Sequence, residues 1–337
     1  MSALARNLGL DLIRATEAAA LIAGRWMGLN KPREADRAAS RAMYAALNTS
    51  DMEGRIVIGE EGKLHWEGAL AGGKLLGTGK GPAVDVVADA IDGCNLLAQG
   101  HQGALSVVAV APRGAIWAPR PAIYMEKIVV AADVGPALVA ECMDAPAAWT
   151  LALIARAKGK QVGDLVVFVL SRPRHADLVE EIRAAGARVM LLADGDVAGA
   201  LLATTVGSNV DVLMGVGGIP EGLIAACAVR ATGGAMLGRL APQSAAERAA
   251  VEAAGLDTGQ VLTAERLVAT DHVFFAATGI TDGALLAGVQ YVRDRATSNS
   301  MILRGETRTR RRLYAEHLLS EGMPAAVMVD YPKPASL

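Results

Sequence analysis

The chain has 337 residues, and 52% of them are hydrophobic, a composition that excludes an intrinsically disordered protein. Its 33 basic and 35 acidic residues nearly cancel, so no overall field attracts a nucleic acid or an anionic membrane. The three cysteines, Cys94, Cys142 and Cys227, are far apart in sequence and lack the spacing of a zinc site. This usage predicts a reducing compartment, the cytoplasm, and the length allows one large two-lobed fold or two small domains.

The N-terminal half predicts two helices followed by a sheet. Apolar residues recur at helical spacing over 8–27, and charged residues interrupt this stretch, so we expect an amphipathic helix rather than a signal peptide or a membrane span. A second helix is expected over 35–47. Strands are expected at 55–58, 83–88 and 104–111, with a partner strand after the turn at 112–114. Short strands with glycine turns favour a mixed or antiparallel sheet.

In the C-terminal half, expected strands alternate with expected helices. Strands are expected at 165–170, 188–192 and 210–215, and helices at 176–185, 197–202 and 223–232. A surface helix over 243–255 and a strand over 273–277 follow. The alternation predicts a parallel α/β layer with functional groups at the carboxyl ends of its strands, where Arg172, Asp194 and Glu221 fall.

Asp89 and Asp92 lie three residues apart at the end of an apolar strand and precede Gly93. An isolated ionised carboxylate is very costly away from water, and hard divalent cations are its usual partners. Taken alone, the segment is equally consistent with a strand that ends in an Asp-Gly turn. Further acids on separate elements, Asp36, Glu60 and Glu221, could converge with this pair on two metals, which would clamp the attacking and leaving oxygens of a phosphoryl transfer.

Two arginines, Arg172 and Arg174, follow a buried strand, and guanidinium forks bind phosphate oxygens in a bidentate way. A basic loop after a strand is also ordinary. Glycines at 215, 217 and 218 do not have the spacing of a dinucleotide-binding fingerprint, and we expect them to let the backbone approach a sugar ring. The basic run over 304–312 lacks the interleaved aromatics of a nucleic-acid surface, which leaves a solvated face, a subunit contact or an anionic effector site.

These motifs occur together in the order seen in one enzyme family. They are Asp36, Ile-Gly-Glu60, Asp89-x-x-Asp92-Gly, Tyr124-Met-Glu-Lys127, Arg172-Pro-Arg-His175, Asp194-Gly-Asp196, Gly-Gly-x-Pro-Glu221-Gly and Ala277-Thr-Gly-Ile-Thr281. From the first helix to about Arg312 the chain resembles the class II fructose-1,6-bisphosphatases. The resemblance implies an α/β, two-lobed, layered sugar-phosphatase fold shared with inositol monophosphatases. Residues 1–158 would form a metal-binding lobe and 159–337 an α/β sugar-phosphate-binding lobe, with the C-terminal segment free to return to the first.

The resemblance also implies a reaction and a set of site residues. The reaction is metal-dependent hydrolysis of the 1-phosphate of fructose 1,6-bisphosphate by a homo-oligomer, a dimer or a tetramer, with no nucleic-acid or membrane partner. The implied ligands of Mg²⁺ or Mn²⁺ are Asp36, Glu60, Asp89, Asp92 and Glu221. The implied catalytic residues are Glu60, Asp89 and Cys94. The implied substrate contacts are Asp92, Gly93, Cys94, Tyr124, Arg172, Pro173, Arg174, Asp194, Gly195, Asp196, Gly218 and Glu221.

The sequence departs from the family's pattern in several places. Asp92 stands where the family usually has glutamate, Cys94 replaces the threonine beside the attacking water, Ala90 replaces proline, and 61–68 lacks the usual acidic stretch. Two alternatives therefore stay open. The protein could hydrolyse another sugar or cyclitol phosphate, such as sedoheptulose 1,7-bisphosphate or an intermediate of specialised metabolism, or it could be a catalytically weak sugar-phosphate-binding protein.

Overall fold

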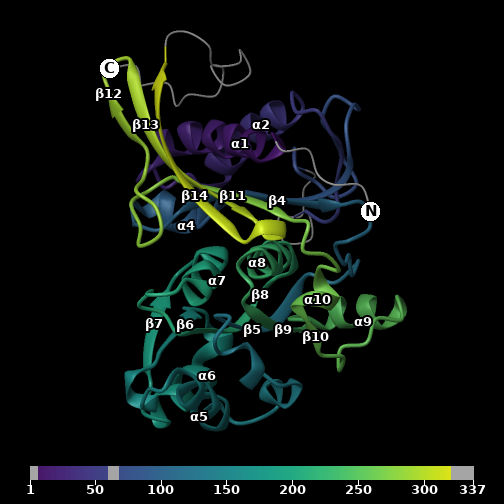
Figure 1. Cartoon of the computed structure of the whole chain (residues 1–337), viewed down its shortest axis with the longest axis vertical. Coiled ribbons are helices and arrows are strands. Elements are labelled where there is room, and N and C mark those ends of the chain that lie inside the picture. Colours follow the sequence, from purple (N-terminus) through teal and green to yellow (C-terminus); the bar gives the residue numbers. More distant parts are fainter. Residues whose placement is uncertain (1–6, 60–67, 320–337) are drawn as a thin grey trace.

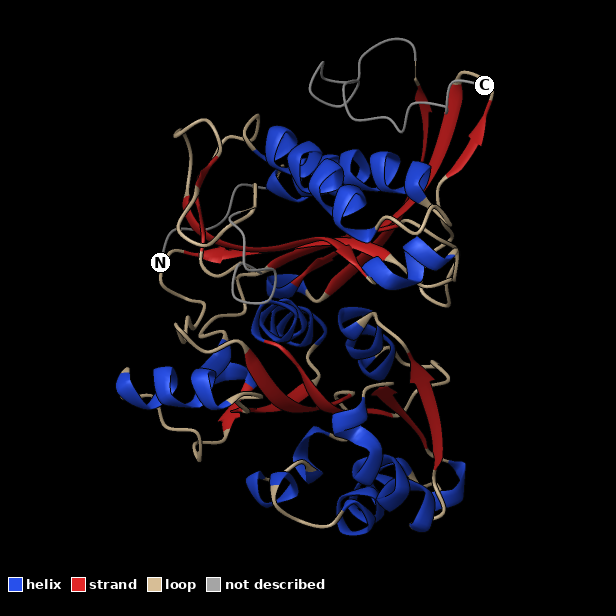
Figure 2. Ribbon diagram, turned by 180° about the vertical axis from the view of Figure 1, so that it is seen from behind, coloured by secondary structure: helices blue, strands red, loops and turns tan. Residues whose placement is uncertain are grey.

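The computed structural model describes residues 7–59 and 68–319, and its elements stack as alternating helix and sheet layers (Figures 1 and 2). The helices are α1 (Leu8–Ala23), α2 (Pro32–Leu47), α4 (Cys94–Gln99), α5 (Ala147–Lys158), α6 (Ala176–Ala184), α7 (Asp196–Thr204), α8 (Ile219–Thr232), α9 (Ala245–Ala253) and α10 (Ala264–Leu267). In Figure 1, α1 and α2 cover one sheet, α7 and α8 separate it from a second sheet, and α5 and α6 cover the far side. The layered α/β fold implied by the resemblance is confirmed.

The first sheet contains eight described strands from both ends of the chain. These are β1 (Glu53–Ile56), β2 (Leu75–Leu76), β3 (Ala83–Asp92), β4 (Leu105–Pro112), β11 (Phe274–Gly279), β12 (Gln290–Val292), β13 (Arg295–Arg304) and β14 (Thr309–Leu318). Their order is β12-β13-β11-β4-β3-β1-β2, and β14 pairs with β13. Only β1 and β3 run parallel, so the expected mixed sheet is confirmed.

The second sheet contains six described strands. These are β5 (Tyr124–Val130), β6 (Val166–Leu170), β7 (Arg188–Leu192), β8 (Val212–Gly218), β9 (Ala235–Leu240) and β10 (Leu262–Thr263), in the order β10-β9-β5-β8-β6-β7. The parallel layer expected from the strands at 165–170, 188–192 and 210–215 is confirmed by β6, β7 and β8, and the sheet also contains β5, β9 and β10, which lie outside that expectation. Pairing is parallel over β7-β6-β8 but antiparallel from β8 through β5 and β9 to β10, because β5 enters from the first sheet and inserts beside β8.

The strand expected directly after the turn at 112–114 does not form. The chain makes only an isolated bridge there, between Ile116 and Val268, before β5 begins. The physical reason is that β3 and β11 already occupy both edges of β4. The chain therefore crosses to the second sheet at β5 and returns to the first at β11, whereas the division into lobes at residue 158 stays a prediction.

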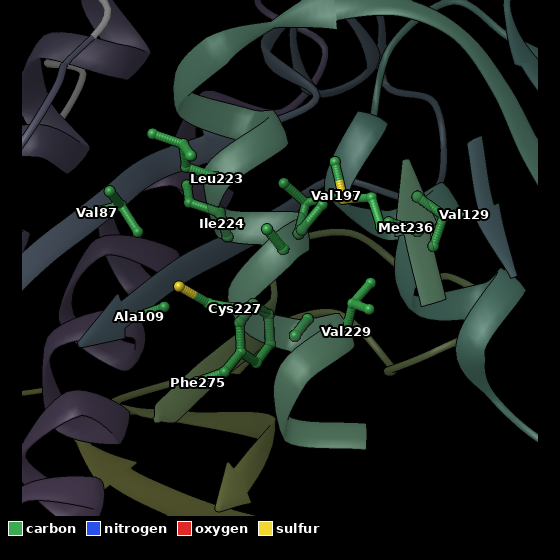
Figure 3. Close-up of a cluster of buried hydrophobic side chains, with 14 of the residues drawn as sticks. Val87, Ala109, Val129, Val197, Leu223, Ile224, Cys227, Val229, Met236 and Phe275 are labelled. Atoms are coloured by element: carbon green, nitrogen blue, oxygen red, sulfur yellow. The ribbon is translucent and has the colours of Figure 1, made fainter. Parts of the chain in front are cut away.

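Helix α8 lies between the two sheets and forms the centre of the larger core. It is apolar nearly all round, as expected of a helix buried on every side. Figure 3 shows Leu223, Ile224 and Cys227 of α8 among Val87 and Phe275 of the first sheet. Among the described helices, none combines the length and the apolar composition that a bilayer crossing requires.

Candidate active site at the junction of the two sheets

A β-bulge at the end of β3 turns Asp89 and Asp92 to the same face of the first sheet. Residues three apart on a regular strand point to opposite faces. Here Asp89 pairs with Val107 and Asp92 with Leu105. Three residue steps along β3 therefore match two steps along β4, so β3 contains one extra residue. Both carboxylates, which are 4% and 3% exposed, therefore face the layer of α7 and α8. Ala90, the residue that replaces the family's proline, lies within this bulge.

Asp92 joins the first sheet to α7. Its Oδ2 accepts a hydrogen bond from the backbone N–H of Ala198 at 3.0 Å, in the first turn of α7, where the helix dipole favours an anion. Burial raises the pKa of Asp92 well above its ordinary range, and the charges of Asp194, Asp196 and Glu221 raise it further. Three further acids thus lie within electrostatic range of Asp92 at this junction.

Asp194 bridges the first helix after β3 to the arginine loop. Its Oδ2 accepts from the backbone N–H and the side-chain amide of Asn95, each at 3.2 Å, and its Oδ1 accepts from Arg172 at 3.3 Å. Gly195, the N-cap residue directly before α7, has a positive φ of 93°. Asp194, an implied substrate contact, therefore also accepts hydrogen bonds from protein donors in this structure.

Asp196 is paired with a buried lysine. The Nζ of Lys127, which is 1% exposed, lies 2.5 Å from Asp196 Oδ2. A side chain at Gly217 would collide with both groups, because its Cβ would lie 1.9 Å from Asp196 Oδ2 and 2.6 Å from Lys127 Nζ. The glycine expected to admit a sugar instead makes room for this ion pair. Gly218, the next residue, is the N-cap of α8 and has an extended conformation, and Glu221 lies in the first turn of that helix.

Tyr124 and Arg174 lie together at the carboxyl end of the second sheet. The Arg174 guanidinium stands 5.3 Å from the centre of the Tyr124 ring, and its Nη2 donates to the carbonyl of Val216 at 2.8 Å. Burial lowers the pKa of Arg174, and the charges of Tyr124, Asp196 and Glu221 oppose that shift. Pro173 opens the short 3₁₀ turn Pro173–His175, which fixes the loop between Arg172 and Arg174.

His175 holds the loop between Arg172 and Arg174 in place through hydrogen bonds to the backbone. Its Nδ1 lies 2.7 Å from the carbonyl of Leu170, and its Nε2 accepts from the backbone N–H of Val216 at 2.8 Å. An imidazole that accepts at Nε2 is neutral and donates from Nδ1, which agrees with the lowering of its pKa, caused first by burial. His175 thus ties the carboxyl end of β6 to β8.

Cys94 begins α4 directly after Gly93, whose φ of 103° lies in the region that favours glycine. The thiol donates to the carbonyl of Ile91 at 3.4 Å, and the side chain packs against the core cluster beneath α1 and α2. Since a thiol is a weak donor and acceptor, this contact agrees with a packing role as well as with a change in catalytic tuning.

The metal ligands implied by the resemblance are not assembled at one point. Across residues 7–59 and 68–319, no three carboxylate, imidazole or thiol side chains form a group that could hold a metal ion, and Glu60 lies outside the described residues. Asp36 is buried on α2, where burial raises its pKa to about 6 and Ser40 donates to it at 3.4 Å. Buried acids with raised pKa values fit a hard cation in charge and in donor chemistry.

Sequence reasoning named Lys127 only as a member of a motif and gave it no role, and it did not single out Asn95 as a site residue. Lys127 had a usable signal, since a lysine within the apolar strand Tyr124–Val130 requires a buried counter-ion. Asn95 had no usable signal in the sequence, because its contact with Asp194 joins residues that are 99 positions apart.

Comparison with known proteins gives the same family as the motifs. A family model described as "Bacterial fructose-1,6-bisphosphatase, glpX-encoded" matches residues 6–317. The chain is 38% identical over 333 residues to "Fructose-1,6-bisphosphatase 1 class 2" of Escherichia coli strain K12, a match that covers 95% of this chain and 97% of that protein. Proteins named "Fructose-1,6-bisphosphatase class 2" from Escherichia coli O6:H1 and Shigella flexneri match to the same extent. The chain therefore belongs to the class II, glpX-encoded fructose-1,6-bisphosphatase family, whose members are phosphoric monoester hydrolases that typically use a divalent metal.

Proposed function

We propose that this protein is a divalent-metal-dependent sugar-bisphosphate phosphatase that removes the 1-phosphate of fructose 1,6-bisphosphate. The observation that carries the proposal is the position of Glu221 between an acidic and a basic group. Burial is the main cause that raises the pKa of Asp92 and lowers that of Arg174, and the charge of Glu221, in the first turn of α8, adds to the first shift and opposes the second. One end of the site thus suits cations and the other suits an anion, as a substrate with two phosphates requires.

The acidic end would hold Mg²⁺ or Mn²⁺ through Asp36, Glu60, Asp89, Asp92 and Glu221. When bound, the ion would act as a Lewis acid that makes water a better nucleophile and neutralises charge on the leaving oxygen. Asp89 and Asp92 contribute through the bulge that aims both at the α7 and α8 layer. Gly93 and Cys94 follow directly and border the place where the scissile phosphate would lie.

The basic end would hold the phosphate that is not cleaved. Arg172, Arg174 and Tyr124 are positioned there by the 3₁₀ turn and by His175. Binding energy from this distal phosphate would orient the reacting one. Asp194 would accept hydrogen bonds from sugar hydroxyls in place of some of its present protein donors. Asp196 would have a structural role, because it is paired with Lys127. The thiols Cys94, Cys142 and Cys227 form no disulfide, which supports a reducing cytoplasm.

The decisive experiment is a phosphate-release screen over sugar mono- and bisphosphates with Mg²⁺ and with Mn²⁺. We expect EDTA to abolish turnover, and Asp89→Asn and Glu221→Gln each to reduce it at least about a hundredfold, the scale seen when a transition-state charge stabiliser is removed. Undiminished turnover in EDTA would refute the metal mechanism. A folded protein that binds sugar phosphates and releases none would instead indicate a binding protein.

The distal anchor has its own test. Arg174→Ala should weaken the preference for bisphosphates over monophosphates by about 2 kcal/mol, typical of a charge-assisted contact. Arg183→Ala is the matched control, because Arg183 lies on α6 in an exposed ion pair with Glu180. Equal losses on both substrate kinds would show that Arg174 does not hold the distal phosphate.

A further inference from the structure

Asn95 connects the two sheets at the candidate site through Asp194. Its backbone N–H and its side-chain Nδ2 both donate to Asp194 Oδ2, each at 3.2 Å. Asn95 lies on α4, which follows β3 of the first sheet, and Asp194 follows β7 of the second sheet. Two hydrogen bonds to one oxygen fix its position more firmly than a single bond does. Asn95 thus determines where the Asp194 carboxylate stands between the two sheets.

The other oxygen of Asp194 has a weaker partner. Arg172 donates to Asp194 Oδ1 at 3.3 Å, and the side chains of Arg172 and Asp194 are 30% and 23% exposed. Ion pairs that are open to solvent contribute little to stability, and a guanidinium group binds a phosphate group in a bidentate way. The contact between Arg172 and Asp194 can therefore open at small cost when a phosphate group reaches Arg172.

The opening of this contact would leave Asp194 Oδ1 available to a new donor. Asn95 and Arg172 lie on different elements, so the bonds from Asn95 to Oδ2 do not depend on the partner that Arg172 takes. A carboxylate that is held at one oxygen and open at the other presents a single directed acceptor. This arrangement suits a hydroxyl group of a sugar whose phosphate group is bound by Arg172.

We propose that Asn95 is a positioning residue that selects phosphate esters of sugars over other phosphate esters. Asn95 does not touch the substrate. It keeps Asp194 in place while Arg172 turns to the distal phosphate, and Asp194 Oδ1 then accepts a hydrogen bond from a sugar hydroxyl. This role rests on the proposed function for the position of the distal phosphate at Arg172. A ligand without a sugar gains nothing from Asp194, so the benefit of Asn95 is confined to sugar phosphates.

Two substitutions separate a hydrogen-bond donor from a side chain that only packs. Asn95→Ala removes the Nδ2 donor and keeps the backbone bond to Asp194. Asn95→Asp keeps the shape of the side chain but places a second carboxylate against Asp194, and like charges at this distance repel. A donor role therefore predicts that Asn95→Asp is worse than Asn95→Ala, whereas a packing role predicts the reverse order. Gln243→Ala is the matched control, because it removes an exposed amide that donates to the carbonyl of Ala241 within its own loop.

The first test is calorimetric measurement of binding in EDTA, which does not depend on turnover. Fructose 6-phosphate has the sugar and the distal phosphate of the proposed substrate, and inorganic phosphate has no sugar. Asn95→Ala should weaken binding of fructose 6-phosphate about tenfold, the scale of one charge-assisted hydrogen bond, and Asn95→Asp should weaken it more. The losses for inorganic phosphate should be at least about fivefold smaller, and Gln243→Ala should bind both ligands as the wild type does. Equal losses for the two ligands, an Asn95→Asp protein that binds as well as the wild type, or a wild type that binds the two ligands alike would each overturn the proposal.

The second test is a double-mutant cycle on the turnover of fructose 1,6-bisphosphate. Asn95→Ala should lower kcat/KM about tenfold, mainly through KM, since the lost interaction acts in substrate binding. The same substitution should cost at most about twofold in an Asp194→Ala background, where its partner is absent. Losses that simply multiply would overturn the role of Asn95 even in an active phosphatase. A wild type that binds fructose 6-phosphate as expected but releases no phosphate would instead refute the proposed phosphatase activity, and the binding series would still support the positioning role.

Discussion

Replacing Asp36 by asparagine should stabilise the metal-free protein while removing a metal ligand. Asp36 is 7% exposed, and burial raises its pKa from 3.8 to about 6, with Ser40 as a hydrogen-bond donor. An asparagine keeps an oxygen that can accept from Ser40 and has no charge to bury. The buried Asp36 carboxylate therefore lowers the free energy of unfolding of the protein unless a cation binds it.

The magnitude follows from the two pKa values. Between 3.8 and about 6 the folded state binds more protons than the unfolded state, so the free energy of unfolding falls as pH rises through this window. A difference of roughly two units corresponds to about 3 kcal/mol above the window and about 1.5 kcal/mol near pH 5. The advantage of Asp36→Asn over the wild type should therefore grow by about 1.5 kcal/mol between pH 5 and pH 8.

The assay is urea unfolding of both proteins in EDTA at pH 5 and at pH 8. Asp133→Asn, on an exposed surface position, is the matched control and should show no such growth. Adding Mn²⁺ at pH 8 should stabilise the wild type more than Asp36→Asn, because only the wild type keeps the anionic ligand. If the two proteins differ by the same amount at both pH values, the account of a buried charge at Asp36 is refuted.

Three further predictions test other parts of the site. Lys127→Met should destabilise the protein by about 3–5 kcal/mol, because it leaves Asp196 buried without its cation, and Lys127→Met with Asp196→Leu should recover most of the loss in a urea titration. Gly217→Ala should destabilise it by about 1–3 kcal/mol through contact with the same ion pair, and an unchanged unfolding midpoint would contradict that packing. Cys94→Ser should keep phosphatase activity and Cys94→Thr should raise it, since a hydroxyl would orient the attacking water better than a thiol, which is a weak donor and a poor acceptor; loss of activity in both would mean that the thiol itself does chemistry.

Much of the local structure was predictable because it depends on neighbours in the sequence. The expected helices over 8–27 and 35–47 correspond to α1 and α2, and the strand expected at 188–192 is β7. Hydrophobic periodicity reports burial of a face whatever the partner is, so it identifies such elements reliably. The surface helix expected over 243–255 is likewise present as α9.

Sequence order by itself determined which motifs occur, and hence the family and the candidate ligands. Tertiary structure decided how those residues meet. The bulge that turns Asp89 and Asp92 to one face exists only because β4 pairs with β3, and local periodicity places them on opposite faces. The pairing of Lys127 with Asp196 depends on β5 entering the second sheet beside β8, which no local pattern encodes. Strand partners are chosen by packing of the whole chain, so the sequence supplied the charged groups and the fold decided which of them neutralise one another.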